Sequence, residues 1–179
     1  MRSLIQKAQK IKMLLLDVDG VMTNGQVLLL PNGDEIKAFS IADGFGIVSA
    51  MKLGIRIGIV SGRSSTSLQQ RCEELHISDL YMNVADKAEV LREIANRYQL
   101  SYENIAYMGD DIPDLPVLET VGLSAAPQSA HHEVKQRVHL VVQKKGGEGA
   151  VREFIEFLLT AQKKDQKLLD LYRTRPEKS

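Results

Sequence analysis

Met13-Leu14-Leu15-Leu16-Asp17-Val18-Asp19-Gly20 is the stretch of this chain that decides its fold. The four apolar residues predict a short strand that is buried on both faces, and Asp17 and Asp19 follow where that strand ends. Parallel α/β sheets bind their ligands beyond the carboxyl ends of their strands. At that position one carboxylate can attack phosphorus, the other can deliver a proton to the departing alcohol, and both can share a divalent cation. The stretch therefore predicts phosphoryl transfer.

Later segments repeat the pattern of an apolar strand followed by polar residues, and each adds a group that this reaction needs. They are Ile55 to Val60 before Ser61-Gly62-Arg63, and Ile105 to Met108 before Gly109-Asp110-Asp111-Ile112-Pro113-Asp114. Between them, Lys87 follows Asp86 at the start of the amphipathic stretch Ala88 to Tyr98, although the helix dipole disfavours a cation in the first turn. The alternation predicts one α/β domain over residues 1–179, with a doubly wound, mainly parallel, Rossmann-like sheet.

Each of these groups also has a plain structural interpretation. Asp-x-Asp-Gly is common in turns, and Ser61, Ser64 or Ser65 can each serve as the N-cap of the helix that follows. Asp110 and Asp111, however, would repel each other at a strand end without a cation nearby. Taken together and in this order along the chain, these groups therefore indicate phosphoryl transfer more specifically than any one of them does.

In this order, and over about residues 11–162, the chain resembles the haloacid dehalogenase superfamily of phosphatases, in its branch without a separate cap domain. The motifs that carry this resemblance are Asp17-Val18-Asp19-Gly20-Val21, Ser61, Lys87, and Gly109-Asp110-Asp111 with Asp114. More narrowly, the chain resembles the family of 3-deoxy-D-manno-octulosonate 8-phosphate phosphatases, which serve lipopolysaccharide biosynthesis. That resemblance lies in Lys37-Ala38-Phe39-Ser40-Ile41, Asp43-Gly44-Phe45-Gly46-Ile47, Ser61-Gly62-Arg63 and Gly146-Gly147-Glu148-Gly149-Ala150-Val151-Arg152-Glu153.

The resemblance implies a catalytic role for four residues. Asp17 is expected to be the nucleophile, which forms an aspartyl-phosphate, and Asp19 the general acid and base. Ser61 and nearby backbone N–H groups are expected to hold the phosphoryl oxygens at a helix N-terminus. Lys87 is expected to neutralise charge from the other side.

The resemblance also implies magnesium and a sugar acid phosphate as ligands. The expected metal ligands are the Asp17 carboxylate, the Asp19 backbone carbonyl and the Asp110 carboxylate, with Asp111 and Asp114 supporting them from behind. The expected substrate-binding residues are Ser40, Asp43, Gly44, Gly62, Arg63, Arg71 and Lys87. Arg63 is better placed than Arg71 for a bidentate contact with the sugar's carboxylate.

Three functional alternatives stay open. Ala42 and Val48 stand where enterobacterial relatives can carry arginine, so a nine-carbon acid such as 2-keto-3-deoxynononate 9-phosphate is an alternative substrate. Arg63 favours the eight-carbon sugar, because the nine-carbon branch can carry an acidic residue there. A receiver-like phosphoacceptor switch and a noncatalytic sugar-acid binding module are alternatives of a different class; the position of Asp19 argues against the first and the intact acidic set against the second.

Residues 25–40 predict a small β-hairpin with strands over Gln26–Leu30 and Glu35–Ser40, turning at Pro31-Asn32-Gly33-Asp34. An isolated two-stranded hairpin is only marginally stable in water, so hairpins from several subunits are expected to pair. The family resemblance implies a homotetramer in which neighbouring subunits complete each site. The alternative is a hairpin folded back onto its own domain.

Composition limits the partners and the compartment. Lys plus Arg and Asp plus Glu both number 23, and this balance gives no reason to expect nucleic acid or a membrane as partner. Cys72 is the single cysteine, so an intrachain disulfide is impossible. The polar N-terminal segment and the lack of a long apolar stretch predict a cytoplasmic protein. Residues 163–179 are expected to form a charged C-terminal helix and tail that extend the last helix.

Overall fold

The fold is a six-stranded, fully parallel sheet in the order β5-β4-β1-β6-β7-β8. A computed structural model describes residues 2–31, 33 and 35–173. The strands are β1 (Met13–Leu16), β4 (Arg56–Val60), β5 (Asp79–Tyr81), β6 (Ile105–Met108), β7 (Leu123–Ala126) and β8 (Leu140–Val141). This is the doubly wound α/β architecture that the sequence predicts.

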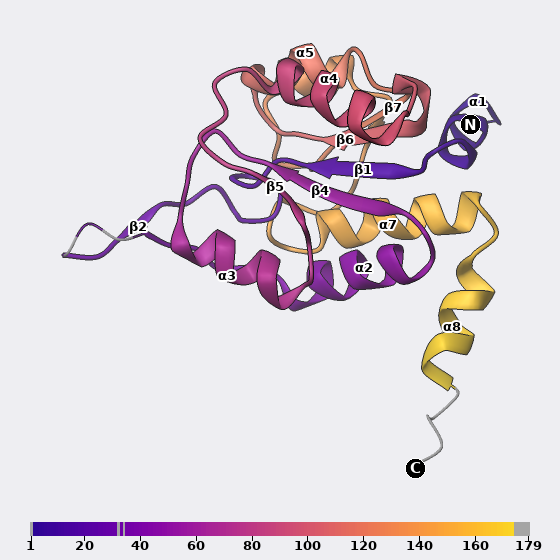
Figure 1. The fold of residues 1–179 in the computed structure, drawn as a ribbon, viewed down its shortest axis with the longest axis horizontal. Helices are drawn as coiled ribbons and strands as arrows, with labels where there is room; N and C mark the ends of the chain where they lie inside the picture. Colours follow the sequence, from indigo (N-terminus) through magenta and orange to yellow (C-terminus); the bar gives the residue numbers. More distant parts are fainter. Residues whose placement is uncertain (1, 32, 34, 174–179) are drawn as a thin grey trace.

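Helices cover both faces of the sheet (Figure 1). One face carries α2 (Ile41–Lys52), α3 (Thr66–Glu74) and α7 (Ala150–Ala161), and the other carries α4 (Lys87–Tyr98), α5 (Leu115–Leu118) and α6 (His132–Arg137). Side chains of β1 alternate between these layers: Leu14 and Leu16 join the first core, Met13 and Leu15 the second. The unbroken apolar run of β1 is explained by this burial on two faces.

The register brings three strand ends to one edge of the sheet. Leu16, the last residue of β1, lies opposite Ile59 of β4 and Met108 of β6. Asp17 continues this alignment, since its N–H donates to the Met108 carbonyl at 3.0 Å. The residues that follow β1, β4 and β6 therefore meet, as the sequence predicts.

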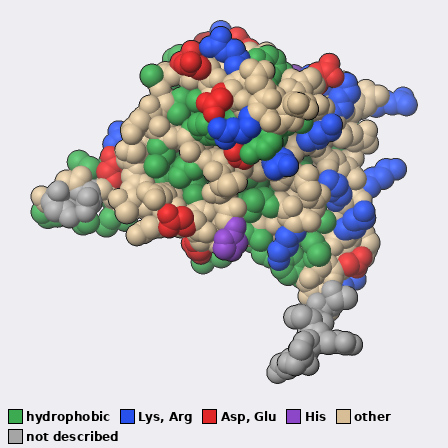
Figure 2. Space-filling model, in the orientation of Figure 1, with side chains coloured by type: hydrophobic (Ala, Val, Ile, Leu, Met, Phe, Trp, Pro, Cys, Tyr) green, Lys and Arg blue, Asp and Glu red, His purple; other side chains and the backbone are tan. Residues whose placement is uncertain are grey.

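The hairpin is present but shorter than expected. Its strands are β2 (Leu28–Leu29) and β3 (Glu35–Ile36), paired antiparallel; Asn32 and Asp34 of the expected turn lie outside the described residues. The hairpin projects from the body, and hydrophobic side chains gather on it (Figures 1 and 2). The exposed apolar side chains are Val27, Leu28, Leu29, Leu30 and Ile36. The apolar part of the described hairpin is therefore not folded back onto its own domain.

The expected C-terminal helix is present, but it does not continue α7 as predicted. After α7 ends at Ala161, Lys163 has a φ of 56°, a left-handed conformation that breaks the helix. The chain resumes as α8 (Asp165–Arg173) in a new direction (Figure 1). Tyr172 of α8 packs on Phe45 of α2 with ring centroids 4.9 Å apart. Residues 174–179 lie outside the described part of the chain.

The N-terminal helix α1 (Arg2–Gln9) packs near α7. Across residues 2–31, 33 and 35–173, every helix is too short or too polar to cross a lipid bilayer.

Candidate active site

Lys87 joins two carboxylates at the edge where the strands end. It is the first residue of α4, after the N-cap Asp86, and its Nζ lies 2.6 Å from Asp17 Oδ1 and 2.7 Å from Asp114 Oδ1. These ion pairs explain why a cation occupies the first turn of a helix, where the dipole opposes it.

Asp114 is buried and its carboxylate is fully used within the protein. Oδ1 accepts from Lys87 and from the Tyr107 hydroxyl at 2.6 Å, while Oδ2 accepts from the N–H groups of Asp110 at 3.0 Å and Asp111 at 3.2 Å. Through these hydrogen bonds Asp114 holds the loop after β6 in place. The exposed Asp111 carboxylate instead accepts from the N–H of Ile112.

The Asp110 carboxylate lies against the loop that follows β1. Carboxylate oxygens of Asp17, Asp110 and Asp114 all lie within 4.8 Å of one another. A Cβ on Gly20 would stand 2.0 Å from Asp110 Oδ2, and Gly20 has a φ of 87°, so only glycine allows this approach. The Asp19–Gly20 backbone and two carboxylates therefore converge, and hard oxygen donors of this kind fit Mg²⁺.

Electrostatics at this cluster fit a cation as well. Burial, and then the charge of Asp114, raise the pKa of Asp17 to about 6; burial, and then Asp17 and the other nearby carboxylates, raise the pKa of Asp110 to about 8. Burial works to lower the pKa of Lys87, but the two carboxylates outweigh it and the pKa is raised. The single positive charge of Lys87 does not neutralise the carboxylates of Asp17, Asp110 and Asp114. A divalent cation among them would favour their ionised forms.

Lys37 contacts the carboxylate of Asp19, and the sequence alone does not predict this contact. Its side chain is 2% exposed, and its Nζ donates to Asp19 Oδ1. The residue follows β3, so the hairpin delivers it to the site. The available signal was its place in the motif Lys37-Ala38-Phe39-Ser40-Ile41.

Arg63 lies at the rim and is paired within the chain. Its guanidinium donates to Oε1 of Glu35, and the Arg63 side chain is 50% exposed. Oε2 of Glu35 lies 3.7 Å from Lys37 Nζ. Arg63 and Asp19 are therefore linked through Glu35 and Lys37.

Ser61 is buried at the end of β4, and its Oγ accepts from the Arg63 N–H at 3.2 Å. The expectation that Ser61 stands at a helix N-terminus is wrong. Helix α3 begins at Thr66 with Ser65 as its N-cap, because Ser65 accepts the N–H of Leu68 at 3.1 Å. Ser61 instead lies in a loop with Gly62, and its backbone bonds to Tyr81 and Val84 on the neighbouring segment.

A second group of expected substrate-binding residues meets at the start of α2. Arg71 Nη2 donates to the Ser40 carbonyl at 3.2 Å and packs against Gly44. Ser40 is the N-cap of α2, where its Oγ accepts from the Asp43 N–H at 3.3 Å. Arg71 thus holds the start of α2.

Asp43 joins the start of α2 to the start of α7. Its Oδ1 accepts from the Arg152 N–H at 2.7 Å, whereas its Oδ2 is buried without a hydrogen-bond partner in the described structure. Burial raises the pKa of Asp43. Asp43 thus serves as a side-chain cap for α7.

The glycine-rich segment before α7 supports the loop after β1. A Cβ on Gly146 would stand 1.7 Å from the Gly20 carbonyl oxygen, and the Gly147 N–H donates to the Val21 carbonyl at 3.0 Å. Only a residue without a side chain permits this packing.

Comparisons with known proteins agree with this geometry. A model of haloacid dehalogenase-like hydrolases matches residues 76–155. The 3-deoxy-D-manno-octulosonate 8-phosphate phosphatase of Escherichia coli K12 is 41% identical over 160 residues, which cover 89% of this chain and 85% of that protein. The chain belongs to this phosphatase family.

Solved structures of family members share the fold closely. The phosphatase of Yersinia pestis is 40% identical with a TM-score of 0.90, covering 92% of this chain and 89% of that one. The enzyme from Moraxella catarrhalis, crystallised with a magnesium ion, a phosphate ion and a KDO molecule, is 33% identical with a TM-score of 0.92, covering 96% and 99%. The predicted resemblance is confirmed.

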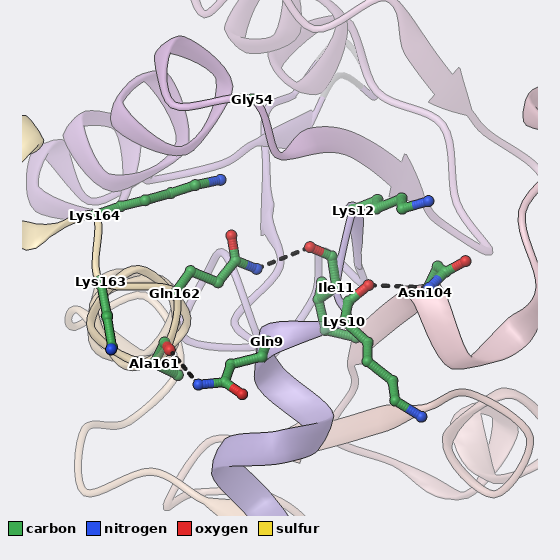
Figure 3. A pocket seen from close by; sticks show the side chains of 10 residues that line it. All are labelled: Gln9, Lys10, Ile11, Lys12, Gly54, Asn104, Ala161, Gln162, Lys163 and Lys164. Atoms are coloured by element: carbon green, nitrogen blue, oxygen red, sulfur yellow. Dashed lines mark hydrogen bonds between the residues drawn. The ribbon is translucent and has the colours of Figure 1, made fainter.

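A large cavity lies near the start of β1, at the edge of the sheet opposite the carboxylate cluster. It has a volume of about 670 Å³ and is lined by Gln9, Lys10, Ile11, Lys12, Gly54, Asn104, Ala161, Gln162, Lys163 and Lys164. The amino groups of Lys12 and Lys163 point in different directions and do not converge on one point (Figure 3). None of the lining residues belongs to the carboxylate cluster, so the cavity is separate from it. Because these amino groups do not converge, the cavity does not resemble an anion-binding site.

Proposed function

We propose that this chain is a magnesium-dependent phosphatase that hydrolyses 3-deoxy-D-manno-octulosonate 8-phosphate to the free sugar acid and phosphate. The observation that carries the proposal is the Asp17 carboxylate, buried at the end of β1 between Lys87 and Asp110, in a chain of this family. The substrate is a small-molecule sugar phosphate, and the enzyme is a phosphoric monoester hydrolase.

In the proposed reaction, Asp17 attacks phosphorus and Asp19 protonates the departing sugar oxygen, so that one P–O bond forms as another breaks. Asp19 then takes a proton from the water that hydrolyses the aspartyl-phosphate, and Asp17 is regenerated. Lys87 orients the Asp17 carboxylate through its 2.6 Å contact. Lys37 orients Asp19.

The Asp17 and Asp110 carboxylates and the Asp19 carbonyl would hold the magnesium ion. When bound, the ion supplies positive charge against the phosphoryl oxygens and the carboxylates. The raised pKa values of Asp17 and Asp110 support this assignment, because both carboxylates are crowded without it.

Ser61, the Gly62 N–H and Lys87 would hold the phosphoryl group, and Arg63 would bind the sugar's carboxylate. The buried Ser61 Oγ and the half-exposed guanidinium of Arg63 support these roles. The segment of Ser40, Asp43 and Gly44, held by Arg71, would contact substrate in a neighbouring subunit of a homotetramer. The exposed apolar hairpin supports such assembly, and the cytoplasmic location stays a prediction.

The nucleophile is tested with Asp17→Asn at saturating magnesium. We expect phosphate release to fall below detection, because an amide oxygen cannot form the acyl phosphate. Asp165→Asn, at the exposed start of α8, is the matched control and should retain activity. Near wild-type turnover by Asp17→Asn would overturn the assignment.

The eight-carbon and nine-carbon sugar acid phosphates are compared in the same assay. The presence of Arg63, whose side chain is half exposed, favours the eight-carbon substrate. We expect a higher kcat/KM for 3-deoxy-D-manno-octulosonate 8-phosphate than for 2-keto-3-deoxynononate 9-phosphate. A long-lived phosphoprotein that turns over neither substrate would instead favour a phosphoacceptor switch.

A further inference from the structure

Glu35 of the hairpin lies between two cations at the rim of the site. Its Oε1 accepts from Arg63 and its Oε2 lies 3.7 Å from Lys37 Nζ. The Glu35 side chain is 16% exposed, and Oε2 is buried without a hydrogen-bond partner among the described residues. One carboxylate oxygen is thus committed to Arg63, while the other is only loosely satisfied.

Arg63 is the group that the proposed function assigns to the carboxylate of the sugar acid. A guanidinium binds a carboxylate best through two parallel N–H donors. Glu35 presents this same functional group to the same guanidinium. The hydrogen bond from Arg63 lowers the pKa of Glu35, so Glu35 is ionised at neutral pH. It can therefore compete with the sugar's carboxylate for Arg63.

The surroundings allow the Glu35 side chain to move while its backbone stays in place. Ser67 of α3 donates its hydroxyl to the Glu35 carbonyl at 3.0 Å, and β3 pairs with β2 through Leu29. Lys37 offers an alternative partner for the displaced carboxylate, because its Nζ already lies close to Oε2.

We infer that Glu35 is an internal competitor for Arg63, which occupies the guanidinium when the site is empty and which the sugar acid's carboxylate must displace. This inference rests on the proposed function, since it requires a ligand with a carboxylate. The carboxylate is present in both substrate and product. Glu35 therefore weakens the binding of both and helps Arg63 to release the product.

The test compares Glu35→Gln with wild type on two esters: the eight-carbon sugar acid phosphate and arabinose 5-phosphate, which has no carboxylate. We expect the ratio of KM for the sugar acid phosphate to KM for arabinose 5-phosphate to fall about two- to fivefold, the amount that one ion pair near the protein surface is worth. The inhibition constant of the free sugar acid should fall by the same factor. Glu133→Gln, which breaks a comparable Glu–Arg pair with Arg137 on α6, should leave the ratio unchanged.

Arg63→Gln supplies the second arm of the test. In that background we expect Glu35→Gln to have no effect on the KM ratio, because the contested group is gone. An unchanged ratio in Glu35→Gln alone, an increased ratio, or a decrease that persists without Arg63 would each overturn the inference. If wild type hydrolyses arabinose 5-phosphate but not the sugar acid phosphate, the proposed function itself fails, which is a different result from an unchanged ratio.

Discussion

Gly20→Ala should displace Asp110 from the site, because the carboxylate occupies the space of the missing side chain. The new Cβ would stand 2.0 Å from Asp110 Oδ2, whereas ordinary contact begins at 3.4 Å. Either the carboxylate retreats by about 1.4 Å or the loop after β1 moves. A misplacement of about 1 Å can cost roughly 100-fold in rate, so we expect kcat/KM to fall by about that factor.

Gly54→Ala is the matched control for backbone strain. Gly54 has a φ of 84°, close to the 87° of Gly20, but apart from Gly54 and its two chain neighbours no described residue has an atom within 4 Å of the place that its Cβ would take. Each substitution should cost about 1–2 kcal/mol of stability for the left-handed conformation. Only Gly20→Ala should also lose activity.

The assay is phosphate release as a function of magnesium concentration, with thermal unfolding of both variants measured in parallel. We expect similar decreases in melting temperature, but a lower kcat/KM and a higher magnesium requirement for Gly20→Ala alone. The reasoning is refuted if Gly20→Ala keeps activity within about threefold of wild type, well short of the expected loss, or if Gly54→Ala loses as much.

Three other changes test individual contacts of the site and its supports. Lys37→Met should lower kcat by roughly 100-fold, the lower limit of a general acid's contribution, because it removes the group that orients Asp19; Lys37→Arg should recover part of this loss in steady-state kinetics. The pKa of Asp110 is raised to about 8, so a divalent cation that binds near neutral pH must displace a proton. The affinity of the site for the cation should therefore rise between about pH 6 and pH 8, by up to about tenfold per pH unit. Calorimetry that finds no pH dependence of this affinity would contradict the prediction. Asp43→Ala should lower the unfolding free energy by about 1 kcal/mol through loss of the α7 cap, whereas Asp43→Asn should restore it in denaturant titrations.

The sequence predicts the sheet well because the strands that carry the site are short, apolar and followed at once by polar residues. The expected strand Ile105–Met108 is observed with the same bounds, and α4 begins at Lys87 as expected. The disfavoured position of Lys87 in its helix was informative, since its partners Asp17 and Asp114 lie 70 and 27 residues away.

Contacts that depend on a weakly specified segment were not predictable. Lys37 reaches Asp19 because two short strands happen to carry it across the site, and nothing in the local periodicity distinguishes it from a solvated lysine. The start of α3 was ambiguous for a different reason. Ser61, Ser64 and Ser65 are chemically equivalent as N-caps, and only the fold selects Ser65.

The contact of Gly146 and Gly147 with residues 20–23 sets an order of events during synthesis of the chain. Strand β1 leaves the ribosome more than 120 residues before the segment that supports the loop after it. In a nascent polypeptide that ends before this segment, the loop that carries Asp19 lacks the contacts that Gly146 and Gly147 make with it. The complete loop therefore forms only after Gly146 and Gly147 have emerged and packed against it.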